Sequence, residues 1–175
     1  MAGNEADFAG LALPHLDAAY NLARWLLRDP VAAEDAVQDA LLRALTYFAS
    51  FRGGNPRAWL LQIVRNVALD RLAAAARARE VPLVAFNDAD ETAVAEPADP
   101  ADDPEAALSR AQDRAALDAA LAALPAELRE CLVLRELEEM SYRDIAQVTG
   151  VPVGTVMSRL WRARRALLPH AEASA

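Results

Sequence analysis

The segment from Ser141 to Leu168 carries the signals of two helices separated by a tight turn. Ser141 is a good helix N-cap, and Asp144 stands three residues later, where it can complete the cap. Gly150 occupies the place of a left-handed turn residue, and Pro152 is tolerated only in the first turn of the following helix. The pattern predicts a helix-turn-helix, so this end of the chain must form packed helices.

The second of these helices separates its apolar and polar residues onto two faces. The apolar positions follow steps of four, three and four residues: Val156, Leu160, Ala163 and Leu167. The opposite side carries hydroxyl groups and arginines: Thr155, Ser158, Arg159, Arg162 and Arg165. Such a helix suits the major groove of DNA, because Arg, Ser and Thr can contact base edges and phosphates. The alternative is a solvated amphipathic helix, but the turn and the paired first helix favour DNA recognition.

The periodicity elsewhere predicts an all-α fold of two small helical domains joined by a linker. Residues 1–80 are expected to form a three-helix domain, residues 81–104 an acidic flexible linker, and residues 105–175 the helix-turn-helix domain. The further helices are predicted over Phe8–Leu27, Val31–Phe48, Arg57–Arg79, Glu105–Leu124 and Ala126–Glu139. Leu117 and Leu137 belong to the apolar sides of the last two.

Charge is distributed unevenly along the chain. The net charge is −8, but residues 81–125 hold two Arg against ten acidic residues, so the remaining residues are neutral overall. The third helix has a basic side, whereas the second presents an acidic and polar face: Asp35, Gln38, Asp39, Leu42 and Arg43. Local fields of this kind decide nucleic-acid binding more than net charge does. Solvated faces remain the alternative for any single charge.

Other classes of protein find little support in the sequence. One cysteine, Cys131, and two histidines cannot build a zinc site or a Cys/His catalytic site, and no Gly-rich phosphate loop or catalytic carboxylate pair is evident. We therefore expect no metal, no cofactor and no enzymatic activity. No apolar run is long enough to span a membrane and no signal peptide is evident, which predicts a cytoplasmic protein without direct membrane insertion.

The chain resembles a known family along most of its length. Leu124 to Leu167 is similar to region 4 of the extracytoplasmic-function (ECF) sigma factors of bacterial RNA polymerase. Asp35–Leu45 and Phe51–Leu72 are similar to region 2 of the same family. Helix-turn-helix modules similar to region 4 occur in other regulators. Region 2 followed by region 4 in one chain is specific to this family.

The resemblance implies a protein that binds core RNA polymerase, directs it to specific promoters and helps to open the DNA. The implied partners are the clamp and flap regions of the polymerase, promoter DNA and an anti-sigma factor that can hold the protein at the membrane. A free monomer is expected. The acidic linker is either a mimic of RNA in the polymerase cleft or a solubilising tether, and the sequence leaves both open.

The resemblance also assigns roles to residues. The −35 element would be read by the recognition helix through Thr155, Met157, Ser158, Arg159, Arg162 and Arg165. Arg165 would lie nearer to phosphate, and Met157 suits a thymine methyl group. The −10 element would be bound by Arg52, Asn55, Arg57, Trp59, Arg65 and Asn66, although Trp59 fits the core equally well. The polymerase would dock on Asp35, Gln38, Asp39, Leu42 and Arg43. Asp70 is expected to be a helix-surface or ion-pair residue rather than a base reader.

Two rival interpretations use the same motifs. A sigma-like decoy that titrates an anti-sigma factor predicts an eroded recognition helix, against which the intact Ser158, Arg159 and Arg162 argue. A one-component repressor predicts dimerisation and tight binding to duplex DNA without polymerase. We favour the sigma factor, which predicts weak binding of the free protein to duplex DNA.

Overall fold

The computed structural model describes residues 2–80 and 104–173, and every regular element in these two ranges is helical. The prediction of an all-α fold is therefore confirmed for the part of the chain that is described. Residues 81–103 of the predicted linker lie outside it. The first range contains α1 (Ala2–Ala12), η1 (Leu13–His15), α2 (Leu16–Leu27), α3 (Pro30–Tyr47), η2 (Phe48–Ser50) and α4 (Pro56–Glu80). The second contains α5 (Pro104–Ala123), α6 (Ala126–Glu136), α7 (Tyr142–Thr149) and α8 (Val153–Ala173).

The single helix predicted over Phe8–Leu27 is wrong, because the chain forms α1 and α2 with a 3₁₀ turn between them. Pro14 stands in this turn. Proline has no backbone N–H to donate, and its ring collides with the carbonyl four residues earlier in a continuous helix. The N-terminal helices therefore include α1 in addition to the three that the periodicity predicts.

The N-terminal helices pack around a core rich in alanine. Helices α2, α3 and α4 contact one another in all three pairs. Small side chains let the helix axes approach closely. The buried residues include Leu22, Leu26, Ala36, Ala40, Leu60 and Val64. This packing positions α3, which carries the predicted polymerase residues, and α4, which carries most of the predicted −10 residues.

The helix-turn-helix forms as predicted. The Ser141 hydroxyl accepts a hydrogen bond from the Asp144 N–H at 3.1 Å and donates one to the Asp144 carboxylate at 2.8 Å. Gly150 ends α7 with a φ of 71°, and its N–H bonds the Ala146 carbonyl at 2.9 Å. The stripe on α8 is buried at Val156, Leu160 and Ala163, so the opposite side of α8 is left for solvent or a ligand.

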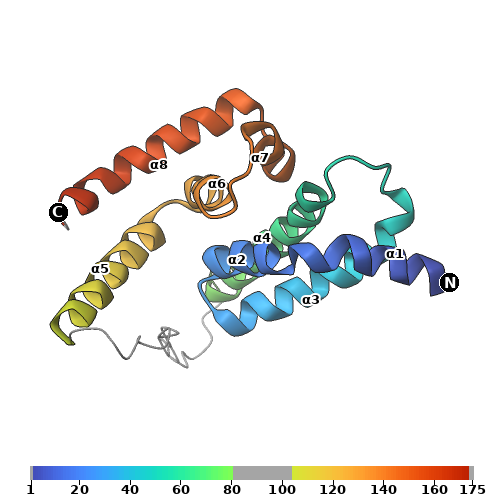
Figure 1. The fold of residues 1–175 in the computed structure, drawn as a ribbon, viewed down its shortest axis with the longest axis horizontal. Helices are drawn as coiled ribbons and strands as arrows, with labels where there is room; N and C mark the ends of the chain where they lie inside the picture. Colours follow the sequence, from blue (N-terminus) through green and yellow to red (C-terminus); the bar gives the residue numbers. More distant parts are fainter. Residues whose placement is uncertain (1, 81–103, 174–175) are drawn as a thin grey trace.

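The two sets of helices pack directly against each other. Helix α2 contacts α6 and α4 contacts α7, and the buried side chains of both sets form one continuous cluster. Figure 1 shows α6 and α7 beside the N-terminal helices, with α5 and α8 farther from them. Arg129 of α6 reinforces this contact, because it donates to the Trp25 carbonyl of α2 at 2.9 Å. The same guanidinium also bonds carbonyls at the end of α5: Leu121, Ala122 and Leu124.

The turn at Gly150 makes a specific prediction about stability. Replacing Gly150→Ala places a Cβ on a left-handed residue, and this is expected to lower the free energy of unfolding by about 1 kcal/mol. Steric contact adds nothing, since a Cβ at Gly150 meets no atom within 4 Å. Urea unfolding followed by circular dichroism measures the change.

Gly154→Ala is the matched control. Gly154 lies within α8 and a Cβ there is equally free of contacts. Because alanine is the better helix former, this variant is expected to gain about 0.5–1 kcal/mol. Equal effects of the two substitutions would contradict the account of the turn.

Candidate nucleic-acid interface

Helix α8 presents a row of polar residues on the side opposite its buried stripe. Thr155, Ser158, Arg162 and Arg165 follow one another at steps of three, four and three, which keeps them on one face. Arg162 and Arg165 are exposed, and the Arg165 guanidinium lies 5.2 Å from the ring centre of Trp161. The Ser158 hydroxyl donates to the Thr155 carbonyl at 3.0 Å. Met157 is exposed at one border of this row, beside Trp161 rather than within it.

Arg159, at the other border of the row, points into the protein. It donates to the Glu130 carboxylate of α6 at 3.2 Å. Arg65 of α4 reaches the same carboxylate through its Nε and Nη2 atoms, at 2.6 and 2.9 Å. Glu130 is 1% exposed, and both arginine side chains are 16% exposed. One buried carboxylate thus brings together a predicted −10 residue and a predicted −35 residue.

Arg57 forms a second junction between the two sets of helices. Its Nη2 pairs with the Glu138 carboxylate, and its Nη1 donates to the Glu138 carbonyl at 2.8 Å. Asn21 of α2 donates to the other carboxylate oxygen at 3.0 Å. The pKa of His15 is lowered by burial and by the positive charge of Arg57. Arg57 and Arg65 therefore lie at the contact between the helix sets.

We name the Glu130 and Glu138 ion pairs with Arg57, Arg65 and Arg159 the carboxylate junction. Sequence analysis missed it, because each glutamate pairs with an arginine 65 or more positions away in the N-terminal helices, which no local pattern encodes. The available signal was weak: Glu130 adjoins Cys131 within a helix pattern that predicts burial.

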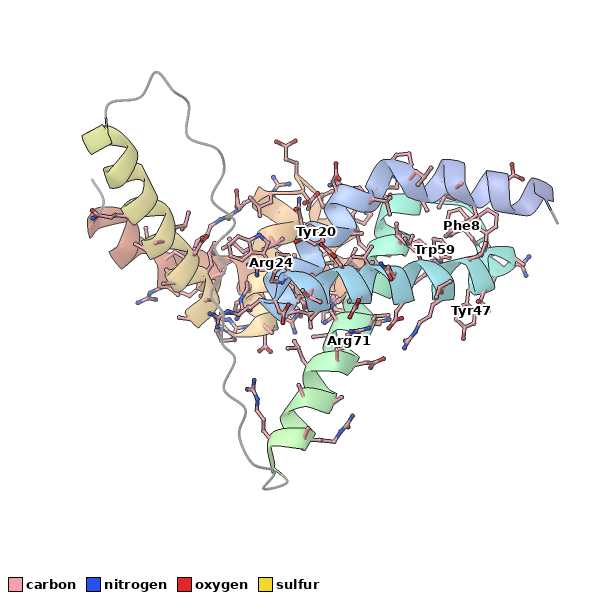
Figure 2. All side chains as sticks on the ribbon, turned by 90° about the horizontal axis from the view of Figure 1, so that it is seen from below. Phe8, Tyr20, Arg24, Tyr47, Trp59 and Arg71 are labelled. Atoms are coloured by element: carbon pink, nitrogen blue, oxygen red, sulfur yellow. The ribbon has the colours of Figure 1, made fainter. Side chains whose placement is uncertain are left out.

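The other predicted −10 residues are placed differently. Arg52 and Asn66 are exposed. Asn55 precedes α4, where its side-chain oxygen accepts from the Ala58 N–H at 3.2 Å, so it acts as a helix cap. Trp59 is half-buried and its ring lies 5.0 Å from that of Phe51. Figure 2 shows Trp59 towards the same end of the N-terminal helices as Phe8 and Tyr47.

The acidic face of α3 divides into two parts. Asp35, Gln38 and Leu42 are exposed, and Leu42 keeps 66% of its surface accessible. The other two residues form ion pairs with α4. Asp39 pairs with Arg71 at 2.6 Å, and Arg43 pairs with Asp70 at 3.4 Å. Arg71 projects from α4 in Figure 2. Asp70 is thus a surface residue of α4 that also forms an ion pair, in agreement with both expectations for it.

An apolar groove of about 560 Å³ opens between α5, α6 and α8. Leu117 and Leu137, which the sequence places on the apolar sides of their helices, line this groove and are 50% and 54% exposed. Leu117 lies on α5, and Leu137 directly follows α6. The remaining apolar lining residues are Trp25, Leu121, Leu132, Val133, Leu167 and Leu168.

Metal sites and membrane-spanning helices are both absent from the ranges that the structure describes. Within residues 2–80 and 104–173, no group of His, Cys, Asp and Glu is placed to hold a metal ion. No helix in the same ranges is long and apolar enough to cross a membrane. Cys131 is buried, and burial together with the neighbouring Glu130 charge raises the pKa of its thiol to about 11.

Comparison with known proteins identifies the family. The profile of "Sigma-70 region 2" matches residues 11–78, and that of "Sigma-70, region 4" matches residues 114–167. An RNA polymerase sigma-H factor of Pseudomonas aeruginosa is 34% identical over 94% of this chain and 86% of its own length. An ECF RNA polymerase sigma-E factor of Haemophilus influenzae is 36% identical over 82% of this chain and 75% of its own length. The chain belongs to the ECF sigma factors.

Two solved ECF-like structures support this assignment. The sigma factor RpoE of Bartonella quintana, solved with the anti-sigma factor NepR, has a TM-score of 0.74 and 30% identity. That likeness covers 95% of this chain and 97% of the other. CnrH, solved with the cytosolic domain of CnrY, has a TM-score of 0.65 and 26% identity, over 99% and 93% of the two chains. The exposed row on α8 thus belongs to the region 4 part of an ECF sigma factor.

The buried thiol beside the junction gives a test of how closed this region is. With a pKa of about 11, Cys131 is almost fully protonated at pH 8. We expect a thiol reagent such as DTNB to label it at least about a hundredfold more slowly in the native protein than in urea. Comparable rates in the two states would contradict burial of α6 at this contact.

Proposed function

We propose that this ECF sigma factor binds core RNA polymerase, directs it to specific promoters and helps to open the DNA. The main support for this proposal is the match to sigma-70 region 2 over residues 11–78, followed by the match to region 4 over residues 114–167. The exposed polar row on α8 supports the proposal, because it leaves a recognition surface on a helix anchored by its other face. The protein supplies binding and specificity rather than chemistry of its own.

In this proposal the −35 element is read by α8. Thr155, Ser158 and Arg162 contact base edges, and Arg165 contacts phosphate. Met157 contacts a thymine methyl group from the border of the row. Arg159 joins them only after it leaves Glu130, since one guanidinium cannot serve the carboxylate and the DNA in the same geometry.

The −10 element is bound at the start of α4. Arg52 and Asn66 offer exposed polar groups, and the paired rings of Trp59 and Phe51 offer a stacking surface for an unpaired base. Arg57 and Arg65 complete this site when their carboxylate partners are released. Asn55 contributes by holding the first turn of α4 in place.

Two surfaces are proposed for the polymerase. The exposed Asp35, Gln38 and Leu42 on α3 combine an apolar contact with negative charge, which suits docking on the clamp. The apolar groove between α5, α6 and α8 suits an apolar segment of the flap. We further propose an anti-sigma factor as a partner, because RpoE of Bartonella quintana was solved with one, and a cytoplasmic location for the free protein.

The proposal is tested by run-off transcription with purified core polymerase on a pool of promoter fragments. Transcripts that appear only when the protein is added support it and reveal the promoter sequence. Tight binding to promoter duplex without polymerase, and no added transcripts, would favour a repressor instead.

Replacing Arg162→Ala is expected to weaken discrimination between the correct −35 sequence and a mutated one by about 1–3 kcal/mol, or about five- to 150-fold. The reason is the loss of a base-edge contact. Arg164→Ala is the control, because this substitution removes the same charge from α8. Arg164 lies on another face of the helix, where it pairs with Glu136 at 2.7 Å. The ratio of transcripts from the two promoters is the measurement. Equal loss of discrimination in both variants would contradict the assignment.

The docking face on α3 is tested by the double variant Asp35→Arg, Leu42→Ala. Loss of the apolar contact and reversal of the charge are expected to weaken binding to core polymerase about tenfold or more. Asp7→Arg on α1 controls for the change of net charge. Retention of full affinity by the double variant in a pull-down titration would show that docking occurs elsewhere.

A further inference from the structure

Trp161 belongs neither to the buried stripe of α8 nor to its polar row. It is 59% exposed and lies at the border of the row, beside Met157. The Arg165 guanidinium lies over its ring, 5.2 Å from the ring centre. That distance is within the reach of about 6 Å over which a cation is attracted to an aromatic face.

The pairing of Arg165 with Trp161 follows from the geometry of a helix. Residues four positions apart lie on one side of an α-helix, and long side chains lean towards its N-terminus. Arg165 therefore extends back along α8 and reaches the ring. The ring covers only the face of the guanidinium, and the N–H donors point outwards in its plane, so stacking leaves these donors free.

Arg135 has the same arrangement with its donors occupied. Its guanidinium lies 5.1 Å from the ring centre of Tyr142, and its Nη1 donates at the same time to the Met140 carbonyl at 2.8 Å. A stacked arginine of this protein thus holds an acceptor with its edge. Within the part of the chain that the structure describes, no carboxylate pairs with Arg165, so its outward donors are available to an external acceptor.

We propose that Trp161 is a positioning residue for promoter binding, because its ring holds the Arg165 guanidinium ready for a DNA phosphate. The inference rests on the proposed function, in which Arg165 contacts phosphate. A phosphate oxygen accepts from the edge of the guanidinium while its face stays on the ring. Binding normally costs an arginine its side-chain entropy, and the stacking reduces that cost because fewer rotamers remain to be restricted.

This role differs from that of a base-reading residue. A phosphate contact strengthens binding without carrying sequence information. Loss of Trp161 is therefore expected to lower the affinity for promoter DNA but to leave the preference for the correct −35 sequence unchanged, whereas loss of Arg162 reduces that preference. The effect also depends on Arg165, since without its guanidinium the ring has nothing to position.

The experiment measures how the complex of the full-length protein with core polymerase binds promoter fragments, by fluorescence anisotropy over a series of salt concentrations. The fragments carry either the −35 sequence recovered by run-off transcription or a mutated one. Trp161→Ala is expected to weaken binding to both fragments about two- to fivefold, as for an exposed cation–π pair. Arg165→Ala is expected to lower the slope of log affinity against log salt by about 1. Adding Trp161→Ala to Arg165→Ala is expected to cost nothing more.

Two substitutions separate the aromatic face of Trp161 from its bulk. Trp161→Phe keeps an aromatic face and is expected to bind within about twofold of wild type. Trp161→Leu keeps an apolar side chain without such a face and is expected to behave like Trp161→Ala. In the free protein, the nuclear magnetic resonance signal of the Arg165 Nε–H reports the stacking directly. The ring current is expected to displace this signal in wild type but not in Trp161→Leu.

Three results would overturn the inference. Wild-type affinity of Trp161→Leu would show that apolar bulk suffices. An equal loss from Trp161→Ala with and without Arg165 would show that the ring acts independently of the guanidinium. Weaker binding of the variant to core polymerase, with DNA binding intact, would place Trp161 in a protein interface instead.

These outcomes are separable from failure of the proposed function. If the proposed function fails, wild type itself adds no transcripts in the run-off assay. If only the role of Trp161 fails, those transcripts and the effect of Arg162→Ala remain.

Discussion

A buried carboxylate, Glu130, is the contact on which the arrangement of this ECF sigma factor depends. It lies on α6 and accepts hydrogen bonds from Arg65 of α4 and Arg159 of α8. A carboxylate that is 1% exposed is stable in the charged form only with cationic partners close by. The packing of α4 on α7 brings those partners together, and the ion pairs in turn fix that packing.

Arginine is suited to both roles that this account gives it. Its planar group of donors fits a carboxylate and a phosphate in the same bidentate way, and it stays charged when buried. A protein that uses arginine to contact DNA can therefore satisfy the same groups internally with glutamate. In the proposed function these arginines contact DNA, whereas in this structure Glu130 and Glu138 accept their hydrogen bonds.

Much of the fold could be predicted, because its signals are local. Ser141, Asp144 and Gly150 specify the ends of α7 through contacts within a few residues. The stripe on α8 specifies its buried face by spacing alone. Pro14 was a readable break, but the apolar pattern on both sides of it suggested one helix.

The candidate site was predictable in part for the same reason. Thr155, Ser158, Arg162 and Arg165 share a face that helical geometry defines. The pairing of Arg65 with Glu130 joins residues 65 positions apart, which no periodicity encodes. The exposure of Leu117 and Leu137 could not be predicted either, because a pattern records which side chains are apolar but not which helix covers them.

The most direct test of the account is the separation of the two sets of helices before and after polymerase binding. Fluorescence labels at Ala73→Cys on α4 and Ala166→Cys on α8 report it, since both positions are exposed and Cys131 is shielded from labelling by burial. The account predicts high energy transfer in the free protein and low transfer once core polymerase and promoter DNA are bound. Transfer that is unchanged by polymerase would contradict the claim that the arginines exchange glutamate for DNA.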